Sequence, residues 1–180
     1  MTAIDSKTKF VLAEIVVVER TLEACAAFLQ QIKKWCYAQM LEQYKKESQK
    51  PVKKRKLIIF VSDKFGNYKT AWKKLFYRIT KMNFGVPIAC KKFGVKHNNN
   101  AVERHNRELS RRFDALNVFQ THEGAQATST LCKVLHNYVN PHSMLHGRTP
   151  AQCAELALPL GTNRLLDLIQ IAKNAEMTIS

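Results

Sequence analysis

The alternation of apolar and polar positions predicts a chain that begins with strands. Residues 10–18 are rich in β-branched side chains, which is typical of a strand buried along most of its length. A short apolar stretch at 1–4 precedes them across a turn-like tetrapeptide at 5–8, so the two runs predict a β-hairpin. From Thr21, apolar residues recur at spacings of three and four, which predicts a helix extending to about Tyr44.

The middle of the chain repeats the order of strand and helix. Residues 57–61 are a continuous apolar run, which predicts a central strand covered on both faces. An apolar stripe over 67–80 predicts the next helix, and residues 86–90 predict a short strand in which Pro87 favours an edge position. The segment at 45–56 is polar and mostly basic, so it predicts a loop between the first helix and the central strand.

The last part of the chain is predicted to be helical. A polar, arginine-rich pattern covers 101–116, and a pattern with one apolar side covers 123–139. Thr149 as a cap and Pro150 at the first helical position predict a further helix, and residues 164–173 predict the last one. Strands early and helices late indicate an α/β fold.

The net charge of the chain is more informative about its partners than its overall composition. The 180 residues are 46% hydrophobic and 24% charged, which is ordinary for a globular domain and excludes wholesale disorder. Lys and Arg number 29 against 14 Asp and Glu, so the net charge is +15. A domain this basic attracts polyanions. Nucleic acid is the first partner to consider, and a membrane surface or a ribosome is the second.

Cysteine and histidine usage excludes other classes. The five cysteines are an odd number without a CxxC pair, which argues against a disulfide framework or a zinc site and for a reducing compartment. His136 and His142 lack a cysteine partner at a suitable spacing, so packing of a helix end is the favoured interpretation. No run approaches the ~18 apolar residues of a membrane span, and no signal-peptide pattern opens the chain. We expect a soluble, intracellular protein.

Asp63 is the first candidate for chemistry. It lies at the C-terminal end of the predicted central strand. Ligands of open α/β sheets bind beyond the carboxyl ends of the strands, so a carboxylate there suits metal binding or catalysis. The alternative is that Asp63 caps the turn before the next helix. The residues alone leave both interpretations open.

Glu103 is the second candidate, one turn into the helix that follows an asparagine run. A glutamate near a helix N-terminus usually serves the helix dipole or a capping box. Glu103 also heads a face that carries Arg107 and Arg111 at helical spacing. A carboxylate that holds a divalent cation, beside arginines that hold phosphates, is what a phosphodiester enzyme needs.

Taken together, these segments resemble the catalytic domain of DDE transposases, the insertion-sequence enzymes that share an RNase H-like fold with retroviral integrases. Four stretches in the expected order carry the resemblance over nearly the whole chain. They are AIDSKTKFVLAEIVVVERTLEACAAFL from Ala3, FVSDKFGNYKTAW from Phe60, NNNAVERHNRELSRRF from Asn98 and HNYVNPHSMLHGRTPAQCAEL from His136.

The resemblance implies an RNase H-like mixed sheet whose first strand is missing or incomplete. It implies a catalytic core at 1–157 and a helical C-terminal tail at 158–180. Asp63 would be the second acid of the family's catalytic triad and Glu103 the third, and both would be metal ligands. The family's chemistry is phosphoryl transfer with two Mg²⁺ or Mn²⁺ ions.

The resemblance also implies DNA as the partner, both transposon ends and target, and a homodimer or larger transposase assembly. It implies a cytoplasmic, nucleoid-associated protein that does not bind membranes. Contacts to DNA phosphates would be salt-sensitive and independent of sequence. They are expected from Lys53, Lys54, Arg55, Lys56, Arg104, Arg107, Arg111 and Arg112.

The chain departs from the family pattern in two ways. The family's first catalytic Asp lies on a strand that precedes the matching region, and Asp5, in the turn after the next strand, is not counted as its replacement. Asn140 stands where the family has Arg before Pro-His. The expectation is therefore a truncated transposase whose two-metal site is incomplete, which binds DNA without cleaving it. Whether the chain is an enzyme stays open.

Two other function classes compete with this reading. A non-catalytic basic nucleic-acid-binding protein would carry the same charge. It differs in leaving the carboxylates of Asp63 and Glu103 outside one metal-coordination sphere. A basic amphipathic protein of the membrane surface is disfavoured, because the lysine cluster lies in a predicted loop and no basic helix has a clean apolar face.

Overall fold

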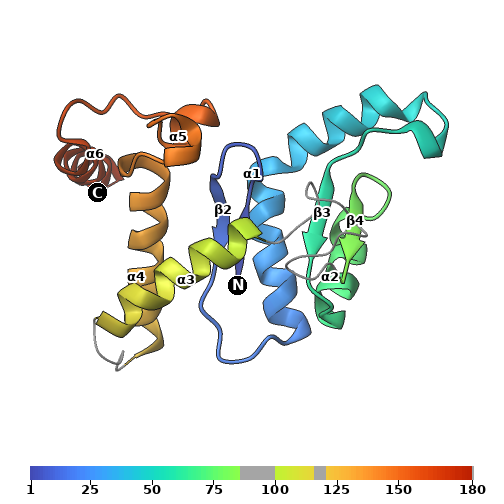
Figure 1. The fold of residues 1–180 in the computed structure, drawn as a ribbon, viewed down its shortest axis with the longest axis horizontal. Helices are drawn as coiled ribbons and strands as arrows, with labels where there is room; N and C mark the ends of the chain where they lie inside the picture. The colour runs from blue at the N-terminus through green and yellow to red at the C-terminus, as the bar shows by residue number, and fades with distance from the viewer. Residues whose placement is uncertain (86–99, 116–120, 180) are drawn as a thin grey trace. The chain divides into compact units, whose positions relative to one another are not determined.

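The computed structural model describes residues 1–85, 100–115 and 121–179 (Figure 1). The chain divides into two compact units, one formed by Met1–Ala3 and Leu12–Val118, the other by Ile4–Val11 and Phe119–Ser180. The predicted mixed α/β class is confirmed, with helices predominating and the strands in small sheets. The RNase H-like arrangement and the boundary between 1–157 and 158–180 stay predictions.

The predicted hairpin is confirmed, with shorter strands than expected. Its strands are β1 (Thr2–Ile4) and β2 (Val11–Glu14). Asp5 belongs to the turn, because its Oδ2 accepts hydrogen bonds from the backbone N–H and the hydroxyl of Thr8, each at 2.7 Å. Such a side-chain bond offers the backbone an alternative to the strand ladder. Asp5 thus has a structural role in the turn.

The first helix, α1 (Leu22–Ser48), begins where the sequence predicts. The hydroxyl of Thr21 accepts from the backbone N–H of Ala24 at 3.1 Å, which caps the helix. The helix extends four residues past the predicted end at Tyr44 and takes in the first part of the expected loop. Basic residues in a last turn are favourable beside the helix dipole, and Lys46 also pairs with Glu42 at 2.7 Å.

A parallel strand–helix–strand segment follows, built from β3 (Ile59–Ser62), α2 (Gly66–Phe76) and β4 (Lys81–Phe84). The two strands pair in register from Ile59 opposite Lys81 to Ser62 opposite Phe84, and Figure 1 shows them side by side. Between α2 and β4 the helix cannot continue, because Arg78 takes a left-handed φ of 77°. The predicted helix at 67–80 is therefore too long. The predicted strand at 86–90 lies outside the described residues.

The apolar run at 57–61 is not covered on both faces as expected, whereas its position as a central strand stays a prediction. Within the described residues β3 pairs with β4 alone, and Ile58 and Ile59 are 37% and 42% exposed. Phe60 faces the core, where its ring lies 5.0 Å from that of Phe76. The apolar run reports a preference for extended backbone, which does not fix how many neighbours the strand has.

One hydrophobic core holds this unit together. It lies between α1 and α2, with Ala13 of β2 at one side and Phe60 and Met82 of the parallel pair at the other. The two helices supply most of its buried members, some of which belong to the predicted amphipathic stripes. The buried members from the helices are Cys25, Phe28, Leu29, Ile32, Met40, Ala71, Trp72 and Phe76.

The helix α3 (Asn100–Ala115) matches the predicted arginine-rich helix at 101–116, whereas the start of its asparagine run lies outside the described residues. It is a polar helix. His105 is its buried residue, and its basic residues Arg104, Arg107 and Arg111 are exposed. Polar contacts therefore matter more for its placement than for that of the other helices.

The second unit is a group of helices. The predicted pattern at 123–139 forms α4 (His122–Val134), which continues as the π-helical segment η4 (Leu135–Val139). The short 3₁₀ turn η5 (Ser143–Leu145) leads to α5 (Pro150–Cys153). The last helix is α6 (Arg164–Ile179), six residues longer than predicted.

The predicted start of α5 is confirmed, and one buried side chain of η4 pairs with backbone groups. Thr149 and Gln152 form a reciprocal capping box at the start of α5, with Pro150 at the first position. Asn137 of η4 is buried, and its side-chain amide accepts from the backbone N–H of Val11 at 2.9 Å and donates to the carbonyl of Val11 at 3.0 Å. This pairing satisfies two backbone groups that would otherwise be buried without partners.

Candidate functional site

The basic segment between α1 and β3 has a defined structure. It contains the 3₁₀ turn η1 (Val52–Lys54) and is tied down by Glu47, whose side chain is buried. One carboxylate oxygen of Glu47 lies 2.6 Å from Nζ of Lys50, and the other accepts from the backbone N–H of Lys56 at 2.8 Å. The amide of Gln43 also donates to the carbonyl of Lys56 at 2.8 Å. The segment is therefore closed at both ends by polar contacts to α1.

Arg55 stabilises the same segment from within. Its Nε donates to the carbonyl of Lys50 and one terminal NH₂ to that of Ser48, both at 2.9 Å. Nζ of Lys81, the first residue of β4, donates to the carbonyl of Arg55 at 2.8 Å. The guanidinium of Arg55 thus has an internal role in the structure, and its predicted contact to DNA stays a prediction.

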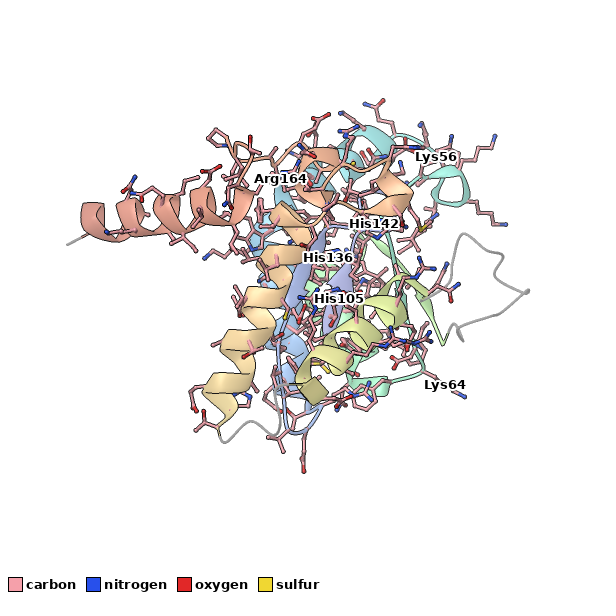
Figure 2. All side chains as sticks on the ribbon, turned by 60° about the vertical axis from the view of Figure 1, so that its left-hand side comes forward. Lys56, Lys64, His105, His136, His142 and Arg164 are labelled. Atoms are coloured by element: carbon pink, nitrogen blue, oxygen red, sulfur yellow. The ribbon has the colours of Figure 1, made fainter. Side chains whose placement is uncertain are left out.

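The side chains of Lys53, Lys54 and Lys56 are exposed on this structured segment, which we call the lysine loop (residues 50–56). Figure 2 labels Lys56 on this segment. A backbone held by hydrogen bonds loses less conformational entropy when its lysines bind an anion. The loop is therefore a preorganised cationic surface.

Glu47 is expected to make the stability of the lysine loop depend on pH. Hydrogen bonds from Lys50, and then from the backbone of Lys56, favour the charged carboxylate and hold the pKa of Glu47 below its usual value of 4.5. The stabilisation is complete above that usual pKa, and it is lost as the pH falls through the lowered pKa of the folded protein. We expect the thermal midpoint of the wild type to fall more than that of a Glu47→Gln variant between about pH 5 and about pH 3. Thermal unfolding followed by circular dichroism tests this, and parallel pH profiles of the two proteins would contradict it.

Asp63 comes directly after β3, as the sequence predicts. Its Oδ2 lies 3.4 Å from a terminal nitrogen of Arg20, and both side chains are 51% exposed. The interpretation of Asp63 as a helix cap is wrong, because the capping position of α2 is Phe65 and no side chain bonds there. At this exposure, the ion pair contributes little to stability.

Arg20 is a residue that sequence reasoning missed. Its guanidinium lies 4.9 Å from the ring centroid of Phe65, and its carbonyl accepts from the amide of Asn67 at 3.0 Å. Arg20 is therefore held by three residues that follow β3, namely Asp63, Phe65 and Asn67. Arg20 lies in the connection before α1, where hydrophobic periodicity carries no signal, and 43 positions separate it from Asp63.

Glu103 lies in the first turn of α3 and is partly buried. It shares one stripe of the helix with Arg107 and Arg111, because residues four apart face the same side. We call the exposed Arg104, Arg107 and Arg111 the arginine face. Arg112 is partly buried, and its guanidinium bonds to Glu108 at 3.1 Å. The convergence of Glu103 with Asp63 on one cation stays a prediction.

A two-metal centre does not fit the part of the chain that the structure describes. In residues 1–85, 100–115 and 121–179, no group of three or more His, Cys, Asp or Glu side chains lies close enough to hold a metal ion. Two-metal phosphoryl transfer needs several carboxylates around its ions. The neighbour of the Asp63 carboxylate is the cationic Arg20. No catalytic step through Mg²⁺ or Mn²⁺ follows from these residues.

His136 and His142, for which the sequence predicts a packing role, each make a hydrogen bond with a backbone group. Nε2 of His136 is 2.9 Å from the carbonyl of Lys9, and Nδ1 of His142 accepts from the backbone N–H of Met144 at 3.2 Å. The two rings lie 6.1 Å apart, edge to face (Figure 2). None of the four cysteines in the described residues, Cys25, Cys36, Cys132 and Cys153, belongs to a disulfide.

Comparison with protein-family models, with curated proteins and with solved structures finds no match for this chain. Its assignment therefore rests on its own residues. Among the helices of residues 1–85, 100–115 and 121–179, none combines the length and apolarity needed to cross a bilayer.

Proposed function

We propose that this chain binds DNA through the phosphate backbone as part of a DDE-type transposase core, and that alone it does not cleave DNA. The observation that carries the proposal is the parallel β3–α2–β4 segment with Asp63 directly beyond the carboxyl end of β3. That edge of an α/β sheet is where functional groups gather. The lysine loop leads into the same strand.

Binding is electrostatic in this proposal. The cations that this proposal assigns to phosphates are three exposed lysines of the lysine loop and three exposed arginines of the arginine face. Each phosphate that they neutralise releases condensed counterions, which favours binding at low salt and weakens it as salt rises. Such contacts position a protein on the duplex without reading its sequence. We therefore expect similar affinity for unrelated duplexes.

We expect no DNA cleavage because the set of catalytic carboxylates is incomplete. The resemblance supplies two of three triad carboxylates, Asp63 and Glu103, and the first already pairs with Arg20. An in-line displacement clamped by two metals needs the complete set of ligands.

The experiment is a nicking and strand-transfer assay with supercoiled plasmid in Mg²⁺ and in Mn²⁺. We expect no product above the level of the Glu103→Gln variant, while both proteins retard the plasmid in a gel. Metal-dependent nicking that Glu103→Gln abolishes would contradict the proposal, because it would require a complete acid site. If neither protein retards the plasmid in the gel, the claim that the chain binds DNA is contradicted.

Two observations also suit a second function. The pairing of Asp63 with Arg20, and the absence of a metal-holding cluster in the described residues, equally suit a basic nucleic-acid-binding protein without catalytic ancestry. The two functions differ in where the Asp63 and Glu103 carboxylates point. Carboxylates within one coordination sphere favour the transposase core, and carboxylates on different faces favour the binding protein.

A further inference from the structure

A buried polar contact joins the polar helix α3 to the strand β2. Nε2 of His105 lies 2.9 Å from Oε2 of Glu14 in β2, and their side chains are 8% and 2% exposed (His105 is labelled in Figure 2). Burying charged or polar groups is costly unless they bond to each other. The pair therefore favours one arrangement of the two elements strongly over its alternatives.

A second polar contact lies next to the first. The hydroxyl of Thr2 in β1 donates to the side-chain carbonyl of Asn106 at 2.9 Å. Consecutive residues of α3 thus bond to the two strands of the hairpin. Hydrogen bonds are directional, so two of them at adjacent helical positions fix the rotation of a helix about its axis. An apolar contact would hold the helix without specifying that rotation.

Helix geometry connects this rotation to the charged surface. Successive residues are 100° apart, so Glu103 and Arg107, two positions before and after His105, both lie about 160° away from it. Exposure agrees with this geometry, since His105 is buried whereas Arg107 and Arg111 are exposed. The residues that bond to the hairpin thereby turn the arginine face outward.

We propose that Glu14 and His105 are positioning residues that set the rotation of α3 and so present its arginine face to DNA. The inference rests on the proposed function, because DNA is the ligand of that face. It adds that two buried residues, neither of which touches DNA, determine how many phosphates the protein contacts.

The test compares variants of Glu14 by duplex binding in a salt series. Glu14→Gln keeps an oxygen acceptor for His105, whereas Glu14→Ala removes it. We expect Glu14→Ala to reduce the slope of log K against log salt by about 2 to 3, the share of three arginines, and Glu14→Gln to stay within about 0.5 of the wild type. Glu108→Ala is the matched control, because Glu108 is an exposed acid on the same helix that bonds to Arg112.

Hydrogen exchange of residues 100–115 supplies a readout without DNA. We expect faster exchange across α3 in Glu14→Ala, at wild-type secondary structure by circular dichroism, and wild-type exchange in Glu14→Gln. Should Glu14→Ala fail to fold, Thr2→Val removes the neighbouring bond at a partly exposed position. Thr2→Val should change the exchange rates of α3 and the salt slope of DNA binding in the same direction as Glu14→Ala, by a smaller amount.

The outcomes separate the two claims. Unchanged exchange in Glu14→Ala overturns the positioning role, and faster exchange with an unchanged salt slope overturns the presentation of the arginine face to DNA. If the wild type shows no salt-dependent binding, the proposed function fails. Faster exchange in Glu14→Ala, rescued in Glu14→Gln, would still support the control of α3 by this pair.

Discussion

Replacing Lys53, Lys54 and Lys56 together with glutamine is expected to weaken duplex binding about 10- to 100-fold at low salt. The three side chains are exposed on a loop that Glu47 holds in place, so the change removes charge and leaves the loop's own contacts intact. The slope of log K against log salt should fall in magnitude by about 3, since each lost phosphate contact removes about 0.9. Fluorescence anisotropy with a labelled duplex measures both quantities.

The matched control changes the same amount of charge elsewhere. Lys7, Lys34 and Lys173 are also exposed, and their combined replacement with glutamine alters the net charge equally. We expect an affinity loss of less than about threefold, because the proposal assigns no phosphate contact to these three lysines. Equal losses in the two triple variants would show that binding follows net charge and that the lysine loop has no special role.

The largest effect on stability is expected from Phe76→Ala, at about 3 to 5 kcal/mol. Phe76 is fully buried at the end of α2, and its ring packs on Phe60 of β3. Its removal leaves a cavity between helix and strand where Trp72 and Thr80 also meet. Because a domain of this size has a total stability of about 5 to 15 kcal/mol, much of it would be lost.

Urea unfolding followed by tryptophan fluorescence measures this loss. The adjacent Tyr77 is 62% exposed, so Tyr77→Ala is the control and should cost less than about 0.5 kcal/mol. A cost below about 1 kcal/mol for Phe76→Ala would contradict the described packing of α2 on β3.

The helices were predictable because their signals are local. The caps at Thr21 and at Thr149 with Pro150 lie within one turn of the residues that they serve, and amphipathic stripes marked the rest. The strand β4 was missed because Lys-Met-Asn-Phe lacks a β-branched run and owes its conformation to pairing with β3.

Of the candidate site, the sequence placed Asp63 at the end of a strand, and the structure agrees. It did not predict Arg20 as the partner of Asp63, nor the pairing of Glu14 with His105. These contacts join residues 43 and 91 positions apart, respectively. Hydrophobic periodicity reports which face of an element is buried, and it contains no information on which buried polar groups meet.

The most direct test of the account is the salt dependence of binding to two duplexes of unrelated sequence. Six exposed cations, three on the lysine loop and three on the arginine face, predict a slope of log K against log salt of about −5 from about 50 to about 200 mM salt. The account predicts the same slope and affinity for both duplexes. A slope near zero, or tight binding to one duplex alone, would contradict it.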